Sequence, residues 1–221
     1  MLVVRSVVVG PFQENCYLAG CDRTGEAVIV DPGDEAPRLL AMREPGGFRV
    51  TRLFATHGHI DHVTAGEALR AATGAPFSIH ADDEAWLQAL PKQAEMFGFP
   101  PVTPPTVDLR HADGDEVKVG EHVGRVIATP GHTRGGTCLH FPEAGVVFTG
   151  DTLFSGSVGR TDLPGGDFDA LRASIVERLF KLGDEVRFFP GHGPGGTLGD
   201  ERRTNPFVGE KRPGSTPGRR G

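Results

Sequence analysis

Seven side chains of metal-binding type fall in four short blocks of this chain. The first block is Thr56-His57-Gly58-His59-Ile60-Asp61-His62, and the others centre on His132, Asp151 and His192. Together they contain five of the nine histidines. Imidazole and carboxylate ligands without cysteine are typical of catalytic zinc, iron or manganese sites. Two such metals can produce a hydroxide nucleophile at neutral pH, so these residues predict a two-metal hydrolase centre.

The spacing of the first block suits two neighbouring metal positions. His57 and His59 are two residues apart after an expected strand, so in an extended chain both rings point to one side and can share a metal. Asp61 and His62 follow where a helix is expected to begin and turn towards a second position, and Asp151 is able to bridge the two. An isolated histidine is more often a core or surface residue, but the joint pattern is far more specific.

The ligands must be positioned by strands, because His132, Asp151 and His192 each follow a glycine close to an apolar run. Glycine at these corners lets the backbone approach the ions. The alternation of β-branched and apolar residues predicts strands at 3–9, 27–30, 52–55, 123–128, 137–141, 146–148 and 186–189. Two mixed sheets packed together, with helices outside, would bury these runs.

Three helices are expected, at about 62–72, 82–90 and 168–182. In the last one, Asp167 can cap the start and Gly183 the end, and Phe168 shares a face with four aliphatic residues. In the second, Trp86, Leu87 and Leu90 should face inward. Residues 91–105 contain five prolines and are expected to be irregular, either as a lid over the site or as a rigid surface connector.

Length and charge limit the other possibilities. The 221 residues suit one domain over 1–210, followed by a basic, disordered tail at 211–221. The net charge of −6 argues against nucleic acid as the main partner, and no membrane segment is expected. Three cysteines, an odd and sparse number, fit a reducing compartment, and we expect a cytoplasmic protein. Nothing in the sequence indicates an oligomeric state.

Several further motifs accompany the metal blocks. They are Asn15-Cys16-Tyr17, Asp31-Pro32-Gly33, Gly150-Asp151-Thr152-Leu153-Phe154, Gly159-Arg160-Thr161-Asp162-Leu163-Pro164, Pro190-Gly191-His192-Gly193 and Glu201-Arg202-Arg203-Thr204-Asn205-Pro206. With these motifs, nearly the whole chain resembles metallo-β-lactamase superfamily hydrolases of the glyoxalase II-like (hydroxyacylglutathione hydrolase) group. Only 29 residues follow His192, so the chain resembles the shorter type, without the C-terminal helical domain that supplies glutathione contacts in larger members.

The resemblance implies an α/β fold, a four-layer αβ/βα sandwich with the metals at one edge of the two sheets. It makes His57, His59 and His132 ligands of the first metal, Asp61, His62 and His192 ligands of the second, and Asp151 the bridge. The expected cofactors are two divalent ions, zinc first, with iron or manganese as alternatives. The expected reaction is hydrolysis of a small thioester derived from glutathione, such as S-lactoylglutathione, with Asp61 orienting the hydroxide.

Substrate contacts are harder to assign. Arg160 is the best candidate for pairing a substrate carboxylate, although a structural pair with Asp162 or Asp167 is equally compatible with the sequence. Tyr17 resembles a family position near the metals and is taken as a second candidate, with packing as the alternative. Cys138 lies in an apolar run and is expected to be a buried core residue, not a nucleophile.

The remaining histidines suggest no ligand role. His80 is placed to cap a helix or to line the cleft, whereas His111, His122 and His140 are expected at the surface.

Two other functions compete with hydrolysis. A persulfide dioxygenase with one iron would use His57, His132 and Asp151 as a two-histidine, one-carboxylate face, and members of that group resemble this chain in the same blocks. A non-catalytic binding protein of the same fold would be expected to have damaged ligand positions, yet all seven are intact.

Overall fold

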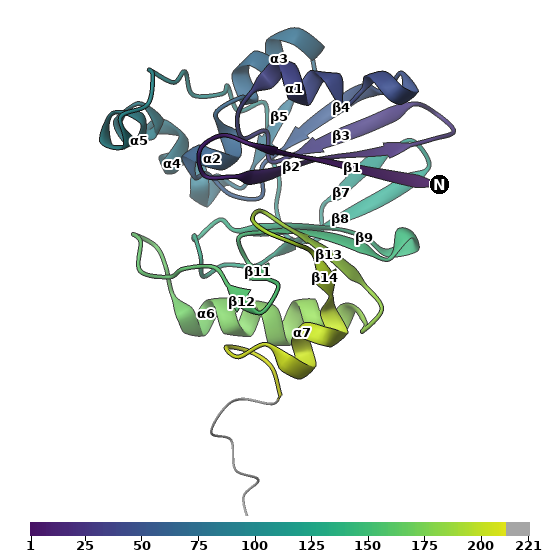
Figure 1. Cartoon of the computed structure of the whole chain (residues 1–221), viewed down its shortest axis with the longest axis vertical. Helices are drawn as coiled ribbons and strands as arrows, with labels where there is room; N and C mark the ends of the chain where they lie inside the picture. The colour runs from purple at the N-terminus through teal and green to yellow at the C-terminus, as the bar shows by residue number, and fades with distance from the viewer. Residues whose placement is uncertain (211–221) are drawn as a thin grey trace, which may run out of the picture.

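The computed structural model describes residues 1–210 as two six-stranded sheets that face each other, with helices outside both (Figure 1). The predicted αβ/βα sandwich is therefore confirmed. The expected disordered tail at 211–221 lies outside the described residues, and the single-domain boundary at 210 stays a prediction.

The first sheet has the strand order β1-β2-β3-β4-β5-β6. The first three strands pair antiparallel and the remaining ones parallel, so the sheet is mixed. Its strands are β1 (Leu2–Val9), β2 (Glu14–Cys21), β3 (Glu26–Val30), β4 (Arg49–Phe54), β5 (Phe77–Ile79) and β6 (Leu109–Arg110). Three of these, β2, β5 and β6, were not predicted, and β4 begins three residues before its predicted start. The omission of β2 matters most, because every residue in it is buried.

The second sheet has the order β14-β13-β10-β9-β8-β7, with β10 and β13 parallel and the other pairs antiparallel. Its strands are β7 (Glu116–Val119), β8 (His122–Ala128), β9 (Thr137–Phe141), β10 (Val146–Gly150), β13 (Arg187–Pro190) and β14 (Gly196–Thr197). A small hairpin of β11 (Leu153–Phe154) and β12 (Ser157–Val158) stands apart from it.

The period-two alternation of strand side chains produces three core layers. In β2, Leu18 faces the helices outside the first sheet, whereas Ala19 faces the second sheet. The layer between the sheets is closed by large side chains from both, such as Phe54 and Phe148. A third cluster joins the outer face of the second sheet to the helical run at 168–182.

The helices lie on the outer faces and at one end of the sandwich (Figure 1). Their bounds are α1 (Ala36–Ala41), α2 (Ile60–Val63), α3 (Gly66–Thr73), α4 (Glu84–Gln88), α5 (Leu90–Phe97), α6 (Phe168–Ala173) and α7 (Leu198–Thr204). Short 3₁₀ turns occur at Glu44–Gly46, Ala81–Asp83, Pro142–Ala144 and Phe180–Leu182, and a π-helical turn at Ser174–Leu179.

The long helix predicted at 168–182 is present as one continuous run through α6, the π turn and the last 3₁₀ turn. Asp167 caps it as expected, because its carboxylate accepts a hydrogen bond from the Ala170 N–H at 2.9 Å. The predicted inward face holds for Leu171, Ile175 and Leu179, but it is wrong for Phe168, which is 41% exposed at the first turn.

The helix predicted at 62–72 is two helices, α2 and α3. They are separated at Ala65, whose N–H bonds to the carbonyls of Pro32 and Gly33 at 3.0 and 3.1 Å. The prediction that residues 91–105 are irregular is wrong for the first half of that stretch, because α5 continues to Phe97. Pro91 stands in the first turn of α5, where the missing N–H costs nothing.

The surface positions predicted for His111 and His140 are wrong, since both are buried. The His111 ring stacks on Phe54 with centroids 4.2 Å apart, and its Nε2 lies 3.1 Å from the Thr137 hydroxyl. Burial lowers the pKa of His111 to about 3. His80 caps as predicted, because its Nδ1 accepts a hydrogen bond from the Asp82 N–H.

Within residues 1–210, no helix has both the length and the apolar character needed to cross a membrane. The three cysteines are free and buried.

Replacing His111 should change how stability depends on pH. An unfolded histidine takes up a proton near pH 6.5, whereas His111 in the fold does so only near 3. Acid therefore favours the unfolded state, and the contribution of His111 is complete above about 6.5 and lost as the pH falls towards 3. His111→Phe should make the free energy of unfolding less steep with pH, by up to about 1.4 kcal/mol per pH unit between 6 and 4. The free energy of unfolding is measured by denaturant titration at several pH values between 6 and 4. The same change with pH in both proteins would contradict this prediction.

Candidate metal centre

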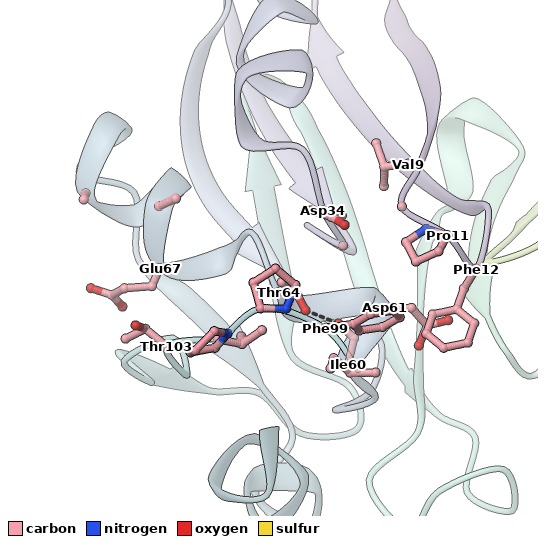
Figure 2. Close-up of a pocket in the computed structure, with 17 residues that line it drawn as sticks. Val9, Pro11, Phe12, Asp34, Ile60, Asp61, Thr64, Glu67, Phe99 and Thr103 are labelled. Carbon is pink, nitrogen blue, oxygen red and sulfur yellow. Dashed lines mark hydrogen bonds between the residues drawn. The ribbon is translucent and has the colours of Figure 1, made fainter. Parts of the chain in front are cut away.

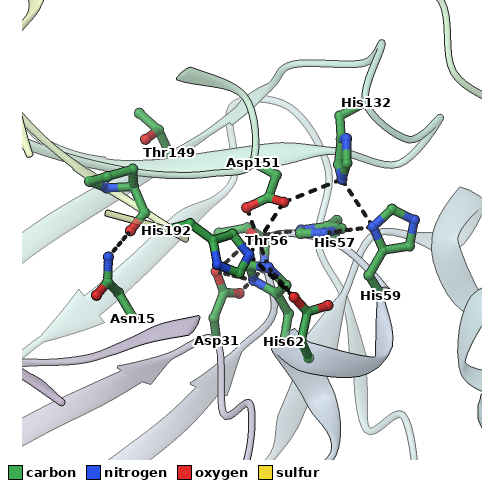
Figure 3. Close-up of polar contacts among 12 residues, drawn as sticks. Asn15, Asp31, Thr56, His57, His59, His62, His132, Thr149, Asp151 and His192 are labelled. Carbon is green, nitrogen blue, oxygen red and sulfur yellow. Dashed lines mark hydrogen bonds and ion pairs between the residues drawn. The ribbon is translucent and has the colours of Figure 1, made fainter. Parts of the chain in front are cut away.

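The seven predicted ligands converge at one edge of the sandwich, where strands of both sheets end (Figure 3). The block from His57 to His62 follows β4, and His132 follows β8. Asp151 follows β10, and His192 follows β13. Segments distant in sequence are thus brought together by the rigid strands that precede them, as expected for a site on loops at a sheet edge.

The first group consists of three imidazoles. The His57 Nε2 and His59 Nδ1 atoms lie 3.1 Å apart, and the His132 Nε2 lies 2.9 Å from the same His59 atom. Two zinc–nitrogen bonds of normal length at a tetrahedral angle place their nitrogens about 3.3 Å apart, so the spacing fits a metal between these rings.

The second group combines carboxylates and imidazoles. The His192 Nε2 lies 3.2 Å from the Asp61 Oδ2, and the His62 Nε2 lies 3.3 Å from the Asp151 Oδ1. The other oxygen of Asp151 is 3.6 Å from the His132 Nε2 and 3.7 Å from the His192 Nε2. Asp151 therefore faces both groups, the position that a bridging carboxylate needs.

The buried polar atoms that lack hydrogen-bond partners also fit a metal at this position. Within residues 1–210, the buried His62 Nε2 and Asp151 Oδ1 atoms, which face the second group, have no hydrogen-bond partner. Donor atoms of His57, His59 and His132 all lie within 4.8 Å of one another, and so do those of Asp61, His62 and His192. Buried polar atoms without partners are costly, and a cation among them removes that cost.

Burial and mutual proximity keep the imidazoles of the first group in the neutral form that binds metals. Burial, reinforced by the neighbouring histidines, holds the pKa of His57 well below its usual value. Burial and then His132 lower the pKa of His59 to about 3. His62 differs: burial lowers its pKa, but Asp151, Asp61 and Asp31 together outweigh burial and raise it.

Ring orientation is fixed by groups behind the ligands. The His132 Nδ1 lies 2.7 Å from the Arg160 carbonyl oxygen, and the His57 Nδ1 lies 3.1 Å from the Thr56 hydroxyl. The Nδ1 of His62 lies 3.1 Å from Asp31 Oδ2. In each case the group behind Nδ1 directs Nε2 into the centre, an arrangement that is common around metal-binding histidines.

Asp31 and Asp83 each connect several of the loops. Asp31 accepts hydrogen bonds from the Thr56 N–H at 2.7 Å and from the Thr56 hydroxyl at 2.8 Å. Asp83, which is fully buried, accepts from the Gly58 N–H at 3.0 Å, the Thr133 hydroxyl at 2.7 Å and the Gly135 N–H at 2.7 Å. Asp83 thus ties the His57–His59 segment to the His132 loop.

Glycines provide the close approach predicted for the corners. A Cβ at Gly191 would lie 2.4 Å from the Asp151 Oδ1 and 2.5 Å from the His62 ring. Gly150 has a φ of +46°, and a Cβ there would lie 2.1 Å from the Thr56 hydroxyl oxygen. Any larger residue at either position would displace a ligand or its support.

Glu14 is a member of the site that the sequence reasoning missed. Its side chain is buried beside Asp31 and His62, and neither carboxylate oxygen has a hydrogen-bond partner within residues 1–210. Burial raises its pKa well above the usual range. The sequence carried no signal for it, because β2, the buried strand that Glu14 opens, was itself not predicted.

The two residues proposed as substrate contacts have different positions. Tyr17 is buried, and its hydroxyl donates to the Pro190 carbonyl at 2.7 Å, just before His192. This bond supports the segment before His192, and the substrate contact expected of Tyr17 stays a prediction. Arg160 lines the cavity over the metal centre, but it forms a two-point ion pair with Asp162 at 2.8 and 2.7 Å, the alternative that the sequence left open. Cys138 is buried as predicted, and burial raises its pKa to about 11.

A cavity of about 630 Å³ opens over the centre. Its floor includes His59, Asp61, His132, Asp151 and His192. Its walls are mostly apolar and come from α4, α5 and the 160–164 segment, as follows: Trp86, Ala89, Lys92, Gln93, Met96, Phe97, Arg160, Leu163 and Pro164. A mostly apolar pocket with a few convergent polar groups is typical of a small-molecule site.

The fold and the ligand set define a metal-dependent hydrolase of the αβ/βα class. The metallo-beta-lactamase superfamily model matches residues 9–192, which include all seven ligand positions. The chain belongs to this superfamily.

A relative by sequence is hydroxyacylglutathione hydrolase GloC of Haemophilus influenzae. It is 37% identical over 210 residues, covering 94% of this chain and 99% of the relative.

Three solved structures are similar. BLEG-1 B3 metallo-beta-lactamase has a TM-score of 0.86 at 34% identity and covers 93% of this chain and 99% of its own. TTHA1623 in a di-iron-bound form has a TM-score of 0.82 at 40% identity, and the match covers 92% of this chain and 99% of that chain. ETHE1 from Myxococcus xanthus has a TM-score of 0.79 at 31% identity, and the match covers 95% of this chain and 86% of that chain.

Removing the Asp83 carboxylate should loosen the centre. Asp83→Ala leaves three buried donors without an acceptor, so we expect the free energy of unfolding to fall by about 3 kcal/mol. Zinc affinity should weaken on the order of tenfold, because the ligand loops lose their common support. The measurements are denaturant unfolding and zinc titration of the metal-free protein. Asp82→Ala, at the exposed neighbouring position, is the control, and equal behaviour of the two variants would contradict the role given to Asp83.

Proposed function

We propose that this protein is a two-metal hydrolase of small thioesters, with S-2-hydroxyacylglutathiones such as S-lactoylglutathione as its substrates. The observation that carries the proposal is the pair of donor groups that share Asp151 beneath a mostly apolar cavity. The similarity to hydroxyacylglutathione hydrolase GloC across nearly the full length of both chains supports the substrate class.

The donor set fits two divalent ions, with zinc proposed first and iron or manganese as alternatives. His57, His59 and His132 would hold one ion, and Asp61, His62 and His192 the other, with Asp151 between them. When bound, such ions supply Lewis acidity and lower the pKa of a coordinated water towards about 7.

Asp61 is placed to orient the attacking water. Its side chain is 18% exposed and lines the cavity, while its Oδ2 contacts His192 at 3.2 Å. Burial raises its pKa, but His62 and His192 outweigh this and lower it, so the carboxylate stays ionised and accepts a hydrogen bond from water. A thiolate leaving group, with a thiol pKa near about 8.5, departs without a strong general acid.

Two cations on the cavity wall suit an anionic thiol carrier. Lys92 lies on α5 and Arg160 on the 160–164 segment, and both line the cavity. A glutathione moiety carries two carboxylates, and Arg160 could exchange its exposed pair with Asp162 for one of them at little cost, because exposed ion pairs contribute little. Trp86, Met96 and Phe97 supply apolar surface between these charges.

A second candidate is a persulfide dioxygenase with one iron on His57, His132 and Asp151. The similarity to TTHA1623 in a di-iron-bound form supports iron as a possible metal of this ligand set. Hydrolysis is favoured because the segment Leu163-Pro164-Gly165-Gly166-Asp167 follows the pattern of the shorter hydrolases, and because the relative GloC is named a hydroxyacylglutathione hydrolase.

Metal analysis together with parallel assays separates these functions. We expect about two metals per chain and release of thiol from S-lactoylglutathione, with no oxygen uptake on glutathione persulfide. One iron per chain with oxygen uptake and no thiol release would replace the hydrolase with the dioxygenase. A chromogenic cephalosporin should be turned over far more slowly than the thioester, and the reverse preference would favour a lactamase.

Asp61→Asn tests the role of the carboxylate directly. The amide keeps the size of the side chain but donates where an acceptor is needed, so kcat for thioester hydrolysis should fall about 10²- to 10³-fold. Rates are compared at equal metal content, after reconstitution with zinc, so that loss of the metal is not mistaken for loss of orientation. Undiminished kcat in the fully loaded variant would remove Asp61 from the mechanism.

A further inference from the structure

A second cavity of about 680 Å³ adjoins the metal-centre cavity, with which it shares Asp61, and Figure 2 shows the residues that line it. It is formed between the 9–12 turn, the start of α3 and the 99–103 segment, none of which contributes a metal ligand. Its volume is within the range of small-molecule sites. Phe12, Ile60 and Asp61 line both cavities.

Three phenylalanines form only part of the partition between the cavities, since Ile60 and Asp61 also line both. Phe97 lines the metal-centre cavity, Phe99 lines the second cavity, and Phe12 lines both. The Phe12 ring lies edge-on to the other two, with centroids 5.2 Å from Phe97 and 5.6 Å from Phe99. Phe12 and Phe97 are 38% and 46% exposed, so the partition is held by contacts at the surface and not by the core.

The two cavities differ in charge. The metal-centre cavity carries Lys92 and Arg160 on its wall, whereas the charged residues that line the second cavity are Asp34, Asp61 and Glu67. Most of the remaining lining is apolar, including Val9, Phe99, Val102 and the small residues Ala68 and Ala71. Such a lining suits an alkyl chain and opposes a ligand with a carboxylate at its far end.

We propose that the second cavity holds the acyl group of the substrate, so that the protein prefers thioesters of apolar acyl chains longer than lactoyl. This inference rests on the proposed thioester hydrolysis. The scissile carbonyl must lie beside Asp61, the one acidic residue that lines both cavities. An anionic thiol carrier paired with Lys92 and Arg160 then extends into one cavity, and the acyl chain extends into the other.

Ala71 and Ala72 of α3 offer a matched pair of variants. Both are exposed on the same helix, but only Ala71 lines the second cavity. Ala71→Phe fills the cavity, whereas Ala72→Phe imposes the same change of helix propensity outside it.

The test compares kcat/KM for the S-lactoyl, S-butanoyl, S-hexanoyl and S-adipoyl thioesters of glutathione. In the wild type, kcat/KM should rise from butanoyl to hexanoyl by up to about fourfold per added methylene. Adipoyl, of the same length but with a terminal carboxylate, should be at least about tenfold poorer than hexanoyl. Ala71→Phe should lower the hexanoyl-to-lactoyl ratio by about tenfold or more, and Ala72→Phe should keep the wild-type ratio.

A ratio that is the same in the wild type and in Ala71→Phe would overturn the acyl cavity, even if lactoyl is hydrolysed as proposed. A calorimetric comparison keeps the two proposals apart, because S-hexylglutathione and S-methylglutathione are thioethers that cannot be hydrolysed. The wild type should bind the hexyl compound at least about tenfold more tightly, and Ala71→Phe should lose that preference. Equal affinities overturn the acyl cavity, whereas the absence of thiol release from every thioester overturns only the hydrolase.

Discussion

The rest of the structure depends on one electrostatic constraint, the close packing of seven polar side chains, four of them buried, whose donor atoms face one another. Three imidazole nitrogens meet at 2.9 to 3.1 Å, and Asp151 faces both groups of donors. Leaving a buried polar group unpaired costs about 1–3 kcal/mol, so cations among the donors would stabilise this arrangement. The centre is therefore the site of chemistry and also a source of instability, which the surrounding sheets and loops must offset.

The scaffold offsets this instability in two ways. The two sheets place the ends of β4, β8, β10 and β13 at one edge, and Asp31 and Asp83 fasten the loops that follow. Both carboxylates are buried and accept hydrogen bonds from backbone N–H groups, as charge-assisted bonds that are stronger than neutral ones. Asp83 accepts hydrogen bonds from no ligand side chain and fixes the backbone from which the ligands project, whereas Asp31 also orients the His62 ring through its Nδ1 at 3.1 Å.

The sequence predicted the site better than it predicted the elements around it. The motif H-x-H-x-D-H fixes the type and spacing of four ligands within one short segment. The other three ligands reach it because the strands that precede them end at the same edge of the sandwich. Strand β2 was missed because Glu-Asn-Cys-Tyr-Leu-Ala-Gly-Cys contains no β-branched residue, and its burial comes from neighbours on both sides. α5 was missed because Pro91 signals a loop unless it is known to stand in the first turn. Glu14 and His111 were beyond reach, since only the assembled layers bury them.

The position of Asp61 joins the centre to the choice of substrate. It follows β4 in the ligand block, contacts His192, and lines both cavities. In the proposed binding mode the thiol carrier and the acyl group extend away from Asp61 in two directions. The cavities on either side of Asp61, one with cations and one with carboxylates, provide those directions. The metal ligands are shared across a broad superfamily, and the fold does not fix the substrate. We therefore expect specificity to reside in segments that carry no ligand, namely the 9–12 turn, α3, α5, the 99–103 segment and the 160–164 segment.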